Sequence, residues 1–190
     1  MTQDRRTEIL EHAADLFAER GVGATTVREI GERAGVFSGS LYHYFGSKNA
    51  IVAELLGAYM SDIQQRFTAA VEAARSPRET IDNLIAETLA VVDDHPRPTA
   101  IYQQDRRYLR DHGLLEAIDG PSREMRTLWL RAIEDGVADG TFRDDVPAET
   151  FYRAVRDALW ASRHWPNRDA YTRAEFTAQM SQIFLGGYLR

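Results

Sequence analysis

Cysteine is absent from the 190-residue chain. This absence excludes disulfide bonds, thiolate nucleophiles, iron–sulfur clusters and zinc sites built from thiolates. Lysine is nearly absent as well, because Lys48 is the one lysine among 23 basic residues. Since the chain uses arginine at every other basic position, position 48 is a candidate for a role that an ammonium group fills.

Long apolar runs are missing too. No segment approaches the roughly 18–20 apolar residues that a membrane-spanning helix needs. Residues 1–10 are polar and charged, without the apolar core of a signal peptide. We therefore expect a cytoplasmic protein with no membrane partner. Excess positive charge is also lacking, since the formal net charge is −6, so contact with DNA would require a local basic patch.

Alternating runs of β-branched residues, which would predict strands, are absent, whereas helical spacing of apolar residues recurs along the chain. Capping boxes of the form S/T-x-x-E mark helix starts at Thr26, Ser76 and Thr172. We predict an all-α protein of about nine helices. They are a first helix ending before Gly21, helices at 26–34, 38–45, 48–74, 77–95, 99–111, 122–139 and 147–164, and a last helix that begins at Thr172.

Charge divides the chain near residue 50. Residues 20–50 carry four basic and two acidic groups, for a net charge of +2, whereas residues 51–190 carry 17 basic and 22 acidic groups, for a net charge of −5. We predict one domain at 1–50 and a second at 51–190. The positive segment of the first domain contains two short helices.

These two short helices have the pattern of a helix-turn-helix at 26–45, with a turn at 35–37 that contains a glycine. The second helix begins with small or polar residues that can enter the major groove of DNA, and hydrogen-bonding side chains follow. Leu41 and Phe45 are four residues apart and can hold this helix to its neighbour. The groove-facing candidates are Ser38, Gly39, Ser40, Tyr42, His43 and Tyr44.

Three segments of this region closely resemble the signature of the TetR family of regulators. They are Thr25-Thr26-Val27-Arg28-Glu29-Ile30, Ala34-Gly35-Val36 and Gly39-Ser40-Leu41-Tyr42-His43-Tyr44-Phe45-Gly46-Ser47-Lys48. The resemblance covers about residues 5–55, and the helices and length of the remainder also fit. It implies a homodimer with an N-terminal three-helix DNA-binding domain and a C-terminal helical domain for ligand binding and dimerisation. It further implies a repressor that leaves a palindromic operator in double-stranded DNA when a small molecule binds.

By matching positions, the resemblance assigns roles to individual residues. Thr26 resembles an N-cap phosphate contact, and Arg28 a groove or phosphate contact. The set that faces the bases is Ser38, Gly39, Ser40 and His43, and the phosphate clamps are Tyr42 and Lys48. The competing interpretation treats the aromatic residues as core and residues 38–40 as a loop.

The second domain carries apolar stripes on its last two helices. The stripes are Phe151, Val155, Leu159 and Ser162 on one helix, and Phe176, Met180, Ile183 and Phe184 on the other. In the family that the chain resembles, the last two helices pair with their copies in a four-helix dimer bundle. We expect these stripes to serve there.

Polar and aromatic side chains on otherwise apolar helices predict an effector pocket. The candidates are Tyr102, Arg106, Trp129, Arg156, Trp160 and Arg163. Aromatic walls with an arginine suit a hydrophobic ligand that has an anionic end. Segments 151–160, 101–103 and 185–187 resemble the acyl-CoA-responsive repressors of steroid or fatty-acid catabolism, so an acyl-CoA is the expected effector.

Three alternatives stay open at this point. The effector could be a drug-like or other lipophilic molecule unrelated to CoA. Arg156 could pair with an acidic residue while Trp160 belongs to the core. A helical adaptor that does not contact DNA is the third, and a gel shift with the protein's own promoter region separates it from a regulator.

Enzymatic function and bound cofactors are not expected. The sequence has no glycine-rich phosphate-binding fingerprint and no G-x-S-x-G motif. His112 and Glu116 are spaced to share a helix face, but a zinc site needs three or four ligands, so we interpret them as a surface pair and expect no metal.

Overall fold

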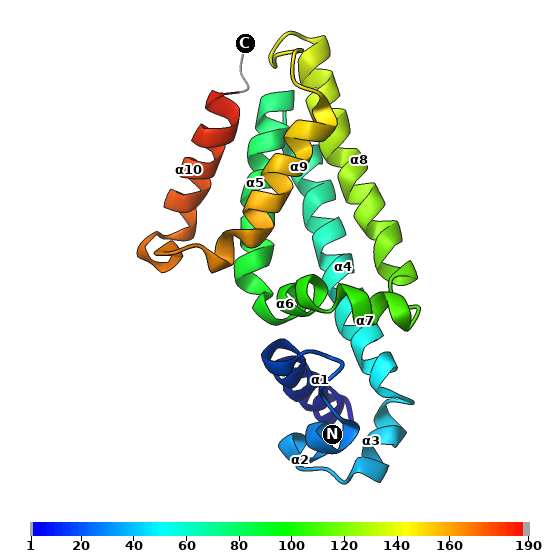
Figure 1. The fold of residues 1–190 in the computed structure, drawn as a ribbon. Helices are drawn as coiled ribbons and strands as arrows, with labels where there is room; N and C mark the ends of the chain where they lie inside the picture. Colours follow the sequence, from blue (N-terminus) through cyan, green and yellow to red (C-terminus); the bar gives the residue numbers. More distant parts are fainter. Residues whose placement is uncertain (1, 188–190) are drawn as a thin grey trace. The chain divides into compact units, whose positions relative to one another are not determined.

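The computed structural model describes residues 2–187, apart from the side chains of residues 2–4 and 117. The described residues form ten α-helices and two short 3-10 helices, with no sheet (Figure 1). The α-helices are α1 (Thr2–Arg20), α2 (Val27–Ala34), α3 (Ser38–Tyr44), α4 (Lys48–Ala73), α5 (Pro77–Asp94), α6 (Pro96–Gln104), α7 (Arg106–Asp111), α8 (Glu116–Ala138), α9 (Ala148–Ala161) and α10 (Arg173–Gly186). The 3-10 helices are η1 (Ser162–His164) and η2 (Arg168–Ala170). The predicted all-α class is confirmed.

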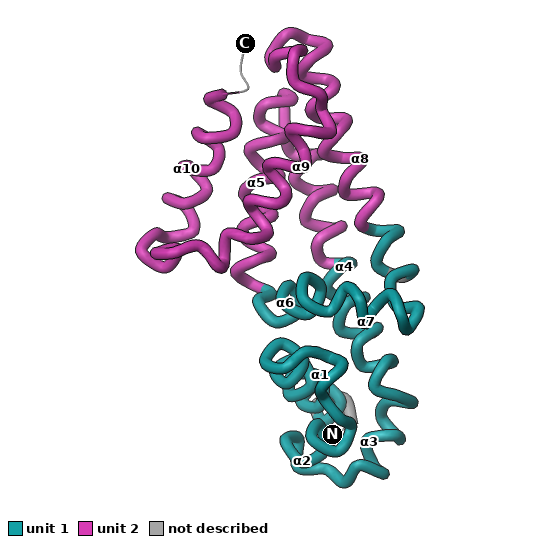
Figure 2. Tube along the Cα trace, viewed as in Figure 1, with its two compact units in different colours: residues 1–61, 95–121 teal, residues 62–94, 122–190 magenta. Residues whose placement is uncertain are grey.

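The helices form two compact units (Figure 2). Unit 1 contains the chain up to residue 61 together with residues 95–121, and unit 2 contains residues 62–94 and the chain from residue 122. Helices α4 and α8 each contribute to both units. Helices α6 and α7 therefore group with the N-terminal helices, a long-range association that the charge division near residue 50 does not reveal.

The core of unit 1 forms where α1 packs against α2 and α6. The apolar residues that predicted α1 face inward, because Ile9, Ala13 and Phe17 are fully buried and Leu16 is nearly so. Each large apolar side chain removed from water contributes about 1.5–3 kcal/mol to stability. The helical spacing read from the sequence therefore identifies the buried face of α1.

Asp105 divides the helix that was predicted at 99–111. This residue takes φ −98° and ψ 18°, outside helical geometry, so α6 ends before it and α7 begins after it. The helix predicted at 122–139 also differs, because α8 begins at Glu116 and contains Pro121. Proline removes one backbone donor but leaves its carbonyl available, and this loss does not end α8.

Unit 2 is built around α5, which packs against both α9 and α10. The stripes predicted to form a dimer bundle serve this packing instead, so that expectation is wrong for most of their members. On α9 and the following turn, Phe151, Val155, Leu159 and Ser162 are buried, and on α10 Phe176 and Met180 are buried. Phe184 is half-buried, with its ring centroid 6.5 Å from that of Phe151, and Ile183, which is 62% exposed, is the member that lies on the surface.

Gly136 on α8 provides a test of the packing in unit 2. A Cβ atom at this position would overlap the ring of Phe142, which is fully buried. We expect Gly136→Ala to lower the free energy of unfolding by roughly 1–3 kcal/mol, the usual cost of overpacking a core. Urea denaturation measures this change.

Gly57→Ala is the matched control, because Gly57 lies inside α4 and nothing is within 4 Å of its added Cβ. Helix propensity alone then predicts a gain of up to about 1 kcal/mol. A Gly136→Ala variant as stable as the Gly57→Ala variant would show that the ring of Phe142 is free to move.

Candidate nucleic-acid interface and effector residues

Helix α2 begins at a complete capping box. The hydroxyl of Thr26 accepts a hydrogen bond from the backbone N–H of Glu29 at 3.2 Å, and the Glu29 carboxylate accepts one from the backbone N–H of Thr26 at 2.8 Å. The bond from the Thr26 backbone N–H is the largest cause that holds the pKa of Glu29 below its usual value, and the Thr26 hydroxyl, which donates to the same carboxylate at 2.8 Å, lowers it further. Thr26 is exposed, so a phosphate can reach it, and its phosphate contact stays a prediction. In that contact the Thr26 hydroxyl would bind the phosphate while it also caps α2.

The turn after α2 brings α3 against it. Gly35 takes the left-handed conformation, with φ 66°, and the backbone N–H of Val36 donates to the carbonyl of Gly31 at 2.9 Å. A Cβ on Gly31 would approach the carbonyl oxygen of Val36 to 2.9 Å, so this close approach requires glycine. Leu41 and Phe45 are buried as predicted and hold α3 in place.

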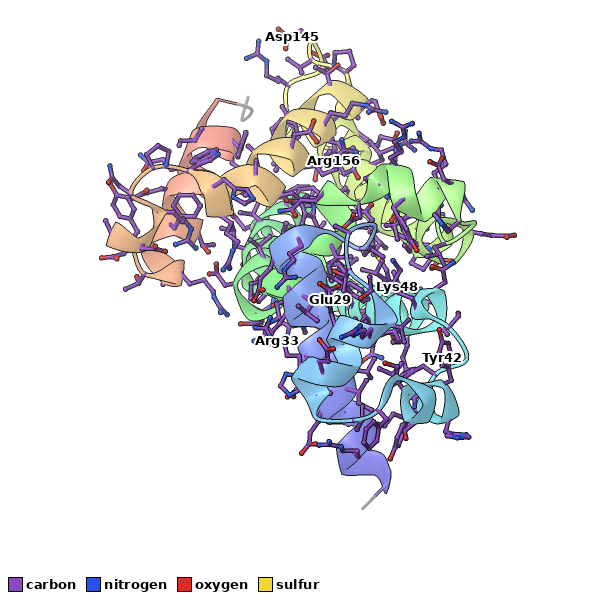
Figure 3. The ribbon with its side chains drawn as sticks, turned by 60° about the horizontal axis from the view of Figure 1, so that its bottom comes forward. Glu29, Arg33, Tyr42, Lys48, Asp145 and Arg156 are labelled. Atoms are coloured by element: carbon purple, nitrogen blue, oxygen red, sulfur yellow. The ribbon has the colours of Figure 1, made fainter. Side chains whose placement is uncertain are left out.

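The residues predicted to face DNA bases lie at or near the surface of α3. Gly39 and His43 are exposed, and Ser38 and Ser40 are half-buried. Tyr42 is 53% exposed, so it is not a core residue (Figure 3). The arrangement leaves these side chains available for contacts outside the chain, and their roles at DNA remain predictions.

The arginines of the positive segment are all engaged in ion pairs. Arg20 pairs with Glu29 at 3.0 Å, Arg33 pairs with Glu19 at 3.0 Å, and Arg28 pairs with Glu32 at 2.7 Å. The hydrogen bond that Arg28 donates to the Glu32 carboxylate raises the pKa of Arg28. These pairs are exposed to solvent, where such contacts contribute little, so a DNA phosphate can compete for the guanidinium groups.

Lys48, which is labelled in Figure 3, has partners within unit 1. Its ammonium donates to the carbonyls of Val22 at 2.7 Å and Thr25 at 2.8 Å. The same nitrogen lies 5.2 Å from the ring centroid of Tyr108. Burial lowers the pKa of Lys48, and the negative charge of Asp105 opposes this shift. An ammonium has three donors, so the predicted phosphate contact of Lys48 would use the one that these two carbonyls leave.

Asp105 completes this junction from the break between α6 and α7. Both of its carboxylate oxygens lie 3.1 Å from the backbone N–H of Val22, and Asp105 is 9% exposed. Gly21, with φ 83°, brings the chain past this carboxylate, and a Cβ there would lie 3.2 Å from Oδ1. The connection from α1 to α2 is thereby fixed by side chains from α4 and the α6–α7 junction, which sequence periodicity did not reveal.

Two of the predicted effector residues belong to unit 1. The guanidinium carbon of Arg106 lies 4.8 Å from the ring centroid of Tyr102, within the range of a cation–π contact. Arg106 also lies 3.7 Å from Asp119. Its Nη1 atom is buried and has no hydrogen-bond partner among the described residues. A buried guanidinium donor without a partner is the kind of group that an anionic ligand satisfies.

The other four predicted effector residues belong to unit 2. The buried ring of Trp129 lies 6.2 Å from that of Tyr152, and the guanidinium of Arg156 lies 5.6 Å from the same Tyr152 ring. Arg156 also donates to Asp157 at 2.6 Å, as the alternative interpretation of this residue proposed. Trp160 is half-buried and Arg163 is exposed.

Tyr152 was missed in the sequence, although its place four residues before Arg156 is a usable signal. Burial raises the pKa of its hydroxyl. Its ring joins Trp129 to Arg156, so these three residues form one aromatic and cationic cluster on α8 and α9.

A cavity of about 280 Å³ opens between α4 and α8 within unit 2. None of the six predicted effector residues lines it; the lining residues are Gln64, Thr68, Glu124, Met125, Thr127, Leu128 and Arg131. Its volume is just below the range typical of small-molecule sites.

No described helix is long and apolar enough to cross a membrane. No group of three or more His, Asp or Glu side chains in this part of the chain has the geometry to hold a metal ion.

Comparisons with known proteins give consistent results along the chain. The sequence profile described as "Bacterial regulatory proteins, tetR family" matches residues 9–55, and that described as "Tetracyclin repressor-like, C-terminal domain" matches residues 74–188. The chain is 36% identical over 184 residues to the HTH-type transcriptional repressor KstR2 of Mycolicibacterium smegmatis, covering 96% of this chain and 90% of the relative. It is 38% identical over 161 residues to KstR2 of Rhodococcus jostii, covering 85% and 79%.

A solved structure, that of the ketosteroid transcriptional regulator KstR2 of Mycobacterium tuberculosis, is similar over nearly the whole chain. The TM-score is 0.91 at 34% sequence identity, with 98% of this chain and 95% of that chain covered. The similarity includes both compact units, so it extends beyond the helix-turn-helix.

The junction at Asp105 makes stability depend on pH. Burial is the largest cause that raises the pKa of Asp105 above 3.8, and it outweighs the Val22 hydrogen bond and the charge of Lys48. The folded chain thus binds this proton more tightly than the unfolded chain does. The contribution of Asp105 to stability is greatest below pH 3.8 and is lost as the pH rises through the raised pKa. We therefore compare the free energies of unfolding of the wild type and of Asp105→Asn by urea denaturation at several pH values. The difference, wild type minus variant, should fall as the pH rises from below 3.8 through the raised pKa of Asp105.

Asp139→Asn supplies a control of opposite sign. Hydrogen bonds from Thr141 lower the pKa of Asp139, so the corresponding difference should rise with pH from below 3.8. A wild-type advantage over Asp105→Asn that grows with pH would mean that Val22 and Lys48 stabilise the ionised carboxylate more than water does.

Proposed function

Because the chain belongs to the tetR family of bacterial regulatory proteins, we propose that it is an effector-controlled repressor that binds a palindromic operator as a homodimer. The observation that carries this proposal is a helix-turn-helix whose recognition helix α3 presents an exposed polar and aromatic surface. Whole-chain similarity to two KstR2 repressors supports it. Such a protein acts on chromosomal DNA in the cytoplasm.

In this function α3 enters the major groove and α2 lies across the phosphate backbone. Arg28 exchanges Glu32 for a phosphate oxygen, because its exposed ion pair costs little to break. Ser38, Ser40 and His43 provide hydrogen-bonding groups toward base edges, and Gly39 leaves room for a close approach. Tyr42 and the free donor of Lys48 contact the backbone on either side.

The contacts of one helix-turn-helix with one half-site are few, so affinity for the operator requires a homodimer that places two copies on the DNA. Two copies of α3 enter successive major grooves about 34 Å apart, so the operator repeats as a palindrome. The overall charge of −6 disfavours adhesion to unrelated DNA. Affinity then depends on a few placed contacts from each copy.

We propose that the effector is a hydrophobic molecule with an anionic end, and that an acyl-CoA derived from a steroid fits this description. The similar structure from Mycobacterium tuberculosis is that of a ketosteroid transcriptional regulator. In this chain, the cluster of Trp129, Tyr152 and Arg156 supplies aromatic surface beside a cation. Within unit 1, the Nη1 of Arg106, which has no partner among the described residues, is a separate candidate donor for an anion.

Release requires the effector to favour a conformation that binds DNA poorly. A preference of a few kcal/mol is enough to shift most of the population. Helix α4 is the element that would transmit the change, because it begins at Lys48 beside the helix-turn-helix and continues into unit 2.

The salt dependence of operator binding tests the backbone contacts. We expect Arg28→Gln to weaken binding to all sequences and to reduce the slope of log K against log salt by about one unit in each half-site. Arg107→Gln on α7 is the matched control, because Arg107 also pairs with an acidic residue four positions later, at 3.7 Å, and lies outside the helix-turn-helix. Equal slopes for both variants would remove Arg28 from the interface.

Lys48→Met belongs in the same titration. A reduced salt slope would assign its third donor to a phosphate, in agreement with the role predicted from the sequence. A loss of affinity with an unchanged slope would instead assign Lys48 to holding the α1–α2 connection through Val22 and Thr25.

The effector is tested by release of a bound operator. We expect a steroid-acid CoA thioester to release the wild-type protein at micromolar concentration, and Arg156→Gln to require at least about tenfold more, since each 1.4 kcal/mol of lost interaction is tenfold in affinity. Arg153→Gln is the control, because it removes an exposed guanidinium from the same helix α9. Fluorescence anisotropy of labelled operator measures both.

The set of compounds decides between the effector classes. Free CoA, the free steroid acid and a long-chain acyl-CoA separate the contributions of the two ends of the ligand. If no CoA thioester releases the operator while a neutral lipophilic compound does, the effector belongs to the second class named from the sequence.

A further inference from the structure

We infer that Phe37 is a specificity residue that recognises thymine in the operator through the thymine 5-methyl group. Phe37 lies in the turn between α2 and α3, one position before the polar residues predicted to face the bases. This inference rests on the proposed DNA-binding role of α3. It names a contact made through apolar surface, whereas the predicted base contacts of Ser38, Ser40 and His43 are polar.

Phe37 is the most exposed of the large hydrophobic side chains that the structure describes. It is 87% exposed, compared with 62% for Ile183 and 53% for Tyr42. A single exposed apolar residue is ordinary on a protein surface, so exposure alone assigns no role. The position of Phe37 in the backbone supplies a second, independent observation.

Phe37 occupies the N-cap position of α3 and forms no side-chain capping bond there. Threonine at the N-caps of α2 and α10 makes a complete capping box in each case. Phenylalanine cannot accept the N–H groups of the first turn, so α3, like α6, α7 and α9, has no side-chain cap. A threonine at position 37 would cap α3, whereas phenylalanine does not. Folding alone therefore does not explain a phenylalanine with an exposed ring at this position.

The surroundings of Phe37 favour an apolar base contact. The seven residues of α3 include no Asp, Glu, Lys or Arg, so the helix lacks the arginine or lysine that most often recognises guanine. Nothing lies within 4 Å of a Cβ added to Gly39, which leaves space beside the turn for the edge of a base pair. In the major groove thymine alone presents a methyl group, and phenylalanine is among the side chains that contact it.

Replacing thymine by deoxyuridine tests the contact, because this change removes only the methyl group. The operator is first obtained by selecting bound sequences from random DNA. Each thymine of a half-site is then replaced in turn, symmetrically in both halves. We expect one position at which deoxyuridine weakens wild-type binding about fourfold per half-site, the equivalent of one buried methyl group. At that position Phe37→Ala should bind thymine and deoxyuridine operators equally.

Two further variants separate this role from a structural one. Phe37→Ser introduces an N-cap hydroxyl without a methyl group, so it should raise the melting temperature while it abolishes discrimination between thymine and deoxyuridine. Tyr171→Ala removes an exposed aromatic ring outside the helix-turn-helix and should leave the discrimination unchanged. Circular dichroism establishes that each variant is folded.

The outcomes separate this inference from the function on which it rests. If the wild type selects no DNA sequence at all, the proposed function fails. If it selects an operator but tolerates deoxyuridine at every position, or if Phe37→Ala retains the wild-type sensitivity to deoxyuridine, the function stands and the role of Phe37 is overturned.

Discussion

The connection between α1 and α2 is the point on which the N-terminal unit depends. The backbone N–H of Val22 and the carbonyls of Val22 and Thr25 find side-chain partners there, and unpaired polar groups that are buried are costly. Asp105 accepts the N–H of Val22, and Lys48 donates to the carbonyls of Val22 and Thr25. Three segments far apart in the sequence are thus held at one place by a carboxylate and an ammonium.

This junction determines where the helix-turn-helix begins. Thr26 follows the connection directly and caps α2, and the turn at Gly35 then directs α3 back against α2. The buried pair of Leu41 and Phe45 is enough to fix α3, which leaves the opposite side of this short helix exposed. The polar junction of Asp105 and Lys48 thus positions the start of the helix-turn-helix, and the burial of Leu41 and Phe45 positions α3 at its end. Together they leave exposed the surface that is proposed to contact DNA.

Electrostatics in this unit are balanced before DNA binds. Arg20, Arg28 and Arg33 all pair with glutamates, and the net positive charge of the segment is offset by its neighbours. Binding is then an exchange of weak, exposed partners for phosphates rather than attraction to an open basic patch. In such an interface, apolar contacts and hydrogen bonds to the bases carry a large share of the sequence preference. The proposed contact of Phe37 with a thymine methyl group is one of these apolar contacts.

The sequence by itself determined the helical class, the helix starts at capping boxes, the buried face of α1 and the helix-turn-helix, because these follow from local spacing and short motifs. Only the tertiary structure decided the break at Asp105, the partners of Lys48 and the inward direction of the stripes on α9 and α10. The physical reason is range. Asp105 and Val22 are 83 residues apart, and periodicity states that a face is apolar without stating whether α5 or another chain covers it.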